Sequence, residues 1–214
     1  DLHLCDRRQR QMCIRDSLYT NLKKLESWVE SEKNLVNKAI LHSLLAREYS
    51  DYMRHNRRQL SDRTALDVDE APADIREWST NLFVAKVDEH NLASLKDSVR
   101  LLEVSSKEYV PFVELEDGSR FYGHDMYHLL AARAVDTYQL LDGFQVDTLQ
   151  RVRINSVYTN MINAYRHRVG AEDAVVLATL DYWKWKSTGG GISREPYTTY
   201  RERKERLDNC LLYT

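Results

Sequence analysis

Apolar side chains recur at steps of three, four or seven residues from Leu18 to Leu60, which is the spacing of one face of a helix. The stripe is formed by Leu18, Leu22, Leu25, Val29, Val36, Ile40 and Leu44. We therefore expect a long N-terminal helix or helical hairpin, followed by a polar, acidic connector that ends the segment 18–73. The stripe fits a coiled coil or packing against later helices of the same chain. We favour the second, because the repeat lapses at Glu32.

A different pattern follows in residues 74–143. The run Leu82–Val87 predicts a strand, and residues 91–102 predict a short amphipathic helix. A second strand is predicted over 109–115, a turn at Asp117–Gly118 and a third strand over 120–122. A longer helix would open at Gly123. This order predicts a small central β-α-β-β-α unit.

The C-terminal part has helical spacing again. We expect helices over residues 147–167 and 171–182, within a segment 144–188. Three consecutive glycines then break the pattern and begin a segment 189–209, in which residues 192–200 are predicted to be extended and 201–207 to be a charged helix. The predicted fold class is therefore α+β, mainly α, with a helical C-terminal part.

The two ends of the chain are set apart by their sequence. Residues 1–17 and 210–214 resemble translated sequencing-adaptor sequence, which would leave the natural protein truncated at both ends. The alternative for the first segment is a natural basic N-terminal arm. All three cysteines, Cys5, Cys13 and Cys210, lie in these ends, so we expect neither a disulfide framework nor a cysteine-ligated metal.

Composition and charge narrow the function classes. The chain is 43% hydrophobic and 30% charged, with a formal net charge of −2, so its overall charge does not attract nucleic acid or an anionic membrane. No apolar run approaches the roughly 20 residues that span a bilayer. Gly189, Gly190 and Gly191 lack the Lys-Ser/Thr pair of a phosphate-binding loop, and we predict no cofactor.

One pattern suggests a metal. His124 and His128 are spaced to share a helix face, with Asp125 where zinc peptidases carry a glutamate. No third ligand has a recognisable spacing, and both histidines fall opposite the predicted apolar stripe of their helix. We therefore interpret them as surface histidines, with Asp125 adding favourable charge to the first turn. No metal site and no catalytic residue is predicted.

Two sets of side chains are candidates for binding. The aromatic residues Tyr122, Tyr127, Trp183 and Trp185 are candidate anchors for another protein. A basic, aromatic patch at the end of the N-terminal helix is the alternative, because stacking and phosphate contacts could bind single-stranded nucleic acid. Its residues are Tyr49, Tyr52, Arg54, Arg57 and Arg58.

The central segment resembles a known family. The run Leu82–Asn91, the helix after it, the run Val110–Ser119 with its Asp-Gly turn and the helix opening Gly123-His124-Asp125-Met126 are similar to a small domain of unknown function. That domain occurs in tail-fibre and tail-fibre-assembly proteins of tailed bacteriophages. The resemblance covers about residues 81–155. It departs at Pro111-Phe112, where a tryptophan-containing pair is usual, and at Gly123, where Thr or Ser is usual.

This resemblance implies a non-enzymatic structural or tail-associated phage protein. Its partners would be other phage structural proteins or further copies of itself, and it would reside in the virion or the host cytoplasm. The alternatives are nucleic-acid binding through the Tyr49–Arg58 patch and, as a third class, a zinc hydrolase on His124 and His128.

Overall fold

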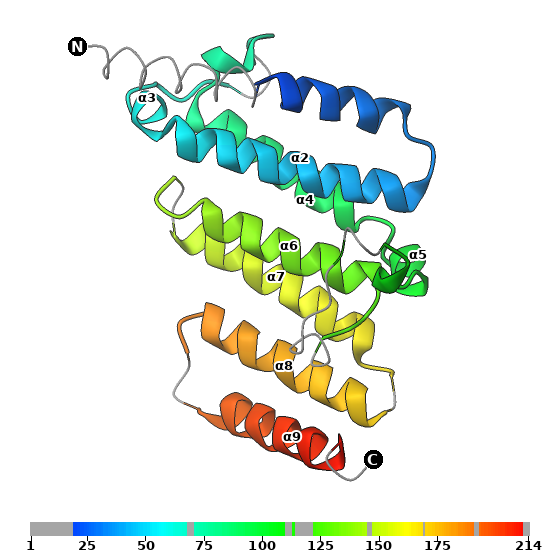
Figure 1. Cartoon of the computed structure of the whole chain (residues 1–214). Coiled ribbons are helices and arrows are strands. Elements are labelled where there is room, and N and C mark those ends of the chain that lie inside the picture. The colour runs from blue at the N-terminus through cyan, green and yellow to red at the C-terminus, as the bar shows by residue number, and fades with distance from the viewer. Residues whose placement is uncertain are drawn as a thin grey trace, which may run out of the picture. The chain divides into compact units, whose positions relative to one another are not determined.

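The computed structural model describes residues 19–67, 71–109, 113, 122–144, 147–168, 170–190 and 193–211. These residues form helices and connecting turns, with no β-sheet (Figure 1). A helix over 19–31 is followed by α2 (Leu35–His55), α3 (Arg57–Ser61), α4 (Thr80–Leu95), α5 (Ser98–Glu103), α6 (Met126–Leu140), α7 (Asp147–Tyr165), α8 (Ala171–Ser187) and α9 (Glu195–Leu211). Short 3-10 helices η2 (Ile75–Glu77) and η3 (Ser106–Tyr109) lie between them. The predicted α+β fold class is therefore wrong, and the described chain is all-α.

The chain divides into two compact units. Unit 1 contains Asp1–Asp97 and Gln139–Gln145, and unit 2 contains Ser98–Tyr138 and Val146–Thr214. Of the predicted adaptor-like ends, 1–17 and 210–214, residues 1–17 and 212–214 lie outside the described residues, and residues 210 and 211 belong to α9.

Unit 1 is organised around the pairing of α2 with α4. The two helices are antiparallel, because His42 contacts His90 while Tyr49, further along α2, contacts Phe83, which comes earlier in α4. Asn34 caps α2: its side-chain oxygen accepts hydrogen bonds from the backbone N–H groups of Val36 and Asn37. The break before Asn34 turns the N-terminal segment into a hairpin of two helices.

The predicted strand Leu82–Val87 is part of α4. Its apolar run is compatible with either a strand or a buried helix, and periodicity alone does not separate them. The buried face continues through His90, Asn91 and Ser94, which are polar. Because these positions do not register as hydrophobic, the helical period of the segment is hidden in the sequence.

The remaining strands of the predicted central unit are not found among the described residues. The predicted helix 91–102 is divided between α4 and α5. Tyr109, the first residue of the predicted second strand, ends η3, and Tyr122 lies in a bend before α6. Most of the second strand, the Asp117–Gly118 turn and residues 120 and 121 lie outside the described residues.

Unit 2 arranges α6, α7, α8 and α9 side by side in chain order (Figure 1). The packing of α7 on α8 and of α8 on α9 is extensive. Tyr182 of α8 stacks on Tyr200 of α9 with ring centroids 4.7 Å apart. The helices predicted to open at Gly123 and to cover residues 147–167 and 171–182 are found as α6, α7 and α8. α6 begins three residues later than predicted, and α8 extends past its predicted end to include Trp183 and Trp185.

The segment 195–200, predicted to be extended, is the first part of α9. The prediction relied on Pro196, which cannot donate a backbone hydrogen bond. In the first turn of a helix that donor is not needed, and the fixed backbone angle of proline suits the helix start. The break before α9 is present, with Gly189 and Gly190 at positive φ.

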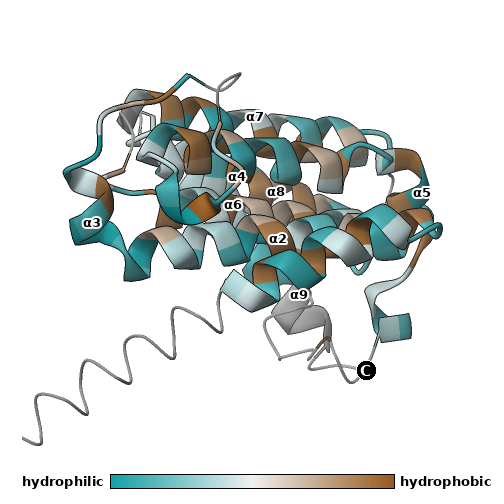
Figure 2. Ribbon diagram, turned by 90° about the horizontal axis from the view of Figure 1, so that it is seen from above, coloured by the Kyte–Doolittle hydropathy of each residue, from teal (hydrophilic) through white to brown (hydrophobic). Residues whose placement is uncertain are grey.

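Polar and apolar residues alternate around the helices without a long apolar stretch (Figure 2). Among the helices of the described residues, none is both long enough and apolar enough to cross a membrane.

Candidate functional site

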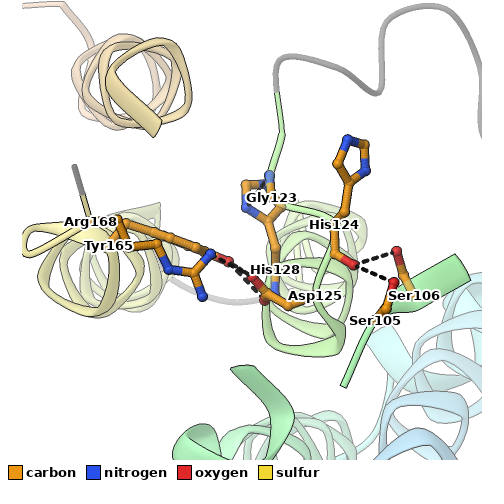
Figure 3. Close-up of polar contacts among 8 residues, drawn as sticks. All are labelled: Ser105, Ser106, Gly123, His124, Asp125, His128, Tyr165 and Arg168. Carbon is orange, nitrogen blue, oxygen red and sulfur yellow. Dashed lines mark hydrogen bonds and ion pairs between the residues drawn. The ribbon is translucent and has the colours of Figure 1, made fainter. Parts of the chain in front are cut away.

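A densely connected polar cluster surrounds Asp125, directly before α6 (Figure 3). The carboxylate is buried, and its Oδ1 accepts a hydrogen bond of 2.9 Å from the backbone N–H of His128. Asp125 therefore caps the N-terminus of α6 and also opposes the positive end of the helix dipole.

Two side chains from the end of α7 complete this arrangement. The hydroxyl of Tyr165 lies 2.8 Å from Oδ1 and 2.7 Å from Oδ2 of Asp125. Nη1 of Arg168 lies 3.3 Å from Oδ2, and its guanidinium carbon is 4.5 Å from the centre of the Tyr165 ring. Burial, followed by the charge of Asp125, raises the pKa of Tyr165, which keeps the hydroxyl protonated as a donor.

His128 packs beneath this cluster. Its Nδ1 accepts a hydrogen bond of 3.1 Å from the backbone N–H of Gly123, so the proton of the neutral ring is on Nε2. Burial lowers the pKa of His128 to about 4. A Cβ atom on Gly123 would lie 2.7 Å from the Tyr165 hydroxyl, which explains the absence of a side chain there.

His124, the residue before Asp125, is held in place by hydrogen bonds to its backbone carbonyl. The carbonyl of His124 accepts hydrogen bonds from the backbone N–H and the hydroxyl of Ser106, at 2.8 and 3.0 Å. The backbone N–H of Met126 donates to the carbonyl of Val104. The imidazole of His124 points away from Asp125 (Figure 3).

A cavity of about 300 Å³ lies beside the cluster, inside unit 2. Its charged lining consists of Glu103, Asp125, Arg168, Glu172 and Asp173. The carboxylates favour a cation, whereas the start of α8 at the same cavity presents the positive end of a helix dipole. These contributions oppose one another, so the cavity does not favour a ligand of either charge. Asp125 itself already bonds to Tyr165, Arg168 and the helix backbone.

The metal interpretation gains no support from this geometry. His124 and His128 do not converge, and His128 is buried, which corrects the expectation that both histidines face solvent. Within the part of the chain that the structure describes, no group of three or more His, Cys, Asp or Glu side chains could hold a metal ion.

The four aromatic candidates for protein contact are less exposed than the sequence suggested. Tyr127 is buried, and Tyr122, Trp183 and Trp185 are half-buried. Trp183 and Trp185 lie near Tyr182, with ring centroids 5.3 and 6.2 Å from it. These side chains contribute to packing in unit 2 and offer only part of their surface to a partner.

The predicted nucleic-acid patch is divided by the fold. Tyr49 and Tyr52 are buried in an aromatic core with Trp78 and Phe83. A base could not stack on them in this conformation. The arginines Arg54, Arg57 and Arg58 are exposed; Arg54 forms an ion pair with Asp51, and Arg57 lies over the ring of Phe144.

Unit 1 contains a second buried polar cluster. Nδ1 of His42 and Nδ1 of His90 are 2.9 Å apart, and the His90 ring stacks on Tyr49 with centroids separated by 5.6 Å. The Tyr49 hydroxyl donates to Glu26 of the helix over 19–31. Burial lowers the pKa of His90 to about 4 and also lowers the pKa of His42.

Sequence reasoning missed Tyr165, Arg168, His42 and His90. Tyr165 and Arg168 are 40 and 43 residues from Asp125, and His42 is 48 residues from His90. Asp125 itself carried a local signal, because an aspartate directly before an apolar helix is a preferred N-cap.

Comparison of the chain with protein families, with curated proteins and with solved structures finds no match.

Proposed function

We propose that this protein acts without catalysis, as a helical scaffold that binds another protein through the outer face of α7. The observation that carries this proposal is a face of α7 on which two exposed aliphatic side chains, Leu149 and Val152, are followed by uncharged polar side chains.

The charge pattern of α7 is unusual for this chain. Charged residues make up 30% of the sequence, yet residues 154–165 contain none. The side of α7 turned away from its core carries Leu149, Val152, Ser156, Asn160 and Asn163, all exposed. Arg151 and Arg153 flank Val152, so the charge-free part of this side begins after them. Depletion of charge is one feature of the buried centre of a protein interface.

The exposed apolar residues are not needed for the core of unit 2. The buried side of α7 is formed by Ile154, Val157, Met161 and Tyr165. Leu149 and Val152, which are 52% and 59% exposed, lie on nearly the opposite side of the helix. Exposed aliphatic side chains that are neighbours on one face suit contact with a partner.

The arrangement of unit 2 supports the same function. Helices that lie side by side in chain order provide an extended surface, as repeat scaffolds do. A narrower proposal, a tail-associated protein of tailed bacteriophages, relies on the resemblance in residues 81–155 alone. Within that range, Leu82–Val87 is helical where the resemblance implies a strand.

The proposal is tested by placing a photo-crosslinking amino acid at position 152 of the whole chain. Light scattering of the purified protein first establishes whether the partner is a second copy. For a different protein, the crosslinked species is identified by mass spectrometry and its affinity for the purified chain is measured. Leu149→Glu combined with Val152→Glu should weaken binding at least about tenfold, since charges at an apolar contact must be desolvated.

Val99→Glu is the matched control. Val99 lies on α5 of unit 2 and is 74% exposed, so the substitution places a negative charge on an exposed aliphatic position of another helix. Binding should be unchanged in this variant. A monomer that forms no crosslink from position 152, or an equal loss of affinity in the control, would contradict the proposal.

A further inference from the structure

The contact between His42 and His90 joins the two long helices of unit 1. His42 is half-buried on α2, and His90 is buried on α4. Their Nδ1 atoms are 2.9 Å apart, and their ring centroids are 5.1 Å apart. This is a direct hydrogen bond between two imidazoles, which has no role in the proposed binding surface on α7.

Such a hydrogen bond requires a particular protonation state. One Nδ1 must carry a proton and donate it, and the other must present its lone pair. When each ring carries a single proton the pair is neutral and bonded. One added proton on the free Nε2 of the donating ring leaves the hydrogen bond in place with a single positive charge. When both rings are cationic the acceptor is lost, and two positive charges are in contact at a partly buried site.

The surroundings of the pair oppose a positive charge on either ring. Burial is the main cause of the lowered pKa of both histidines. From α2, the cation Lys38 lowers the pKa of His42 and Tyr49 stacks on His90; from α4, Lys86 lowers the pKa of His90. The carboxylates Glu89, on α4, and Glu26, on the helix over 19–31, act in the opposite direction without reversing the result.

We propose that the His42–His90 pair is an acid-sensitive latch that holds α2 against α4 at neutral pH and opens when both rings become cationic. The ring of His90 stacks on Tyr49, whose hydroxyl donates to Glu26. Opening of the latch therefore also loosens the attachment of the helix over 19–31. The expected function is a response of unit 1 to acidification, independent of any partner on α7.

Amide hydrogen exchange of the whole chain tests the latch. Peptides from α2 and α4 are followed at pH 7.5 and pH 5.0, with the intrinsic pH dependence of exchange removed. The opening equilibrium constant should rise on the order of tenfold or more at pH 5.0, because the open state binds protons that the closed state excludes. Protection should return when the pH is raised.

The double variant His42→Asn/His90→Asn should lose this pH response. The control His55→Asn, an exposed histidine on the same helix, should retain it. An opening constant that is unchanged in the wild type between the two pH values, or a full response in the double variant, would overturn the proposal.

Imidazole ¹⁵N NMR of the wild type keeps the test decisive if the double variant does not fold. At pH 7.5 one ring of the pair should be protonated on Nδ1 and the other on Nε2, and both rings should become cationic only well below pH 6.5. Both rings becoming protonated independently near pH 6.5, with α2 and α4 still protected, would refute the latch.

Discussion

The hydroxyl of Tyr165 donates to the carboxylate of Asp125 at 2.7 Å, which fastens the end of α7 to the start of α6. The same carboxylate caps α6 and forms an ion pair with Arg168. One buried acid therefore satisfies a helix terminus, a hydroxyl and a cation. Because each of these groups would lose a partner, substitutions here should affect stability more than those elsewhere on unit 2.

Asp125→Ala should destabilise the protein by about 2–4 kcal/mol, since it removes a helix cap and leaves Tyr165 and Arg168 without their shared acceptor. Tyr165→Phe should cost about 1–2 kcal/mol, because it removes only the hydroxyl. Urea denaturation followed by circular dichroism measures both. Tyr197→Phe, on an exposed tyrosine of α9, serves as control and should change stability by less than about 0.5 kcal/mol. Equal effects of Tyr165→Phe and Tyr197→Phe would contradict this role of the Tyr165 hydroxyl.

Acid should destabilise unit 2 through His128. The pKa of His128 is about 4 in the folded protein and about 6.5 in an unfolded chain, so the unfolded state takes up the proton first as the pH falls. The contribution is fully present above pH 6.5 and is lost between about pH 6.5 and 4, with a limit on the order of 3 kcal/mol. Denaturation curves at several pH values measure this dependence.

His128→Asn isolates that contribution. The asparagine oxygen can accept the N–H of Gly123, but it does not titrate. The slope of unfolding free energy against pH should fall by about one proton relative to the wild type. His167→Asn, at an exposed histidine, should leave the slope unaltered. An unaltered slope in His128→Asn would show that burial of this histidine does not govern the acid response.

Gly123→Ala should destabilise the protein by about 1–3 kcal/mol, because the new Cβ would lie 2.7 Å from the Tyr165 hydroxyl and 3.0 Å from Nδ1 of His128. Both neighbours are held by hydrogen bonds and cannot move freely. At Gly170 a Cβ meets only the side chain of Asp173, so Gly170→Ala should have a smaller effect. Thermal denaturation measures the loss of stability in the two variants. A larger loss in Gly170→Ala than in Gly123→Ala would contradict a steric role for Gly123.

Asn34→Ala should cost about 1 kcal/mol, since the side chain of Asn34 caps α2. Asn34→Asp should keep the stability, because a carboxylate accepts the same hydrogen bonds and interacts favourably with the helix dipole. Urea denaturation followed by circular dichroism measures the stability of both variants. An equal loss in the alanine and aspartate variants would exclude capping as the cause.

Local sequence signals were sufficient for several helices of this protein. The periodic apolar positions and flanking glycines predicted α7 closely, and they predicted the start of α8. They failed where local rules allow two outcomes: the apolar run Leu82–Val87 fits strand or helix, and Pro196 fits extended chain or a first helical turn. In the structure both segments are helical: Leu82–Val87 belongs to α4, which packs against α2, and Pro196 belongs to α9, which packs against α8.

The amino-acid sequence by itself determined a charged, helix-rich chain with a break at Gly189 and Gly190, because these features depend on composition and on neighbouring residues. Only the tertiary structure decided that Asp125 meets Tyr165 and that His42 meets His90. Those contacts join residues 40 and 48 positions apart. Partners at such separations are chosen by how helices pack, and helix packing depends on the shapes of whole buried faces rather than on local spacing.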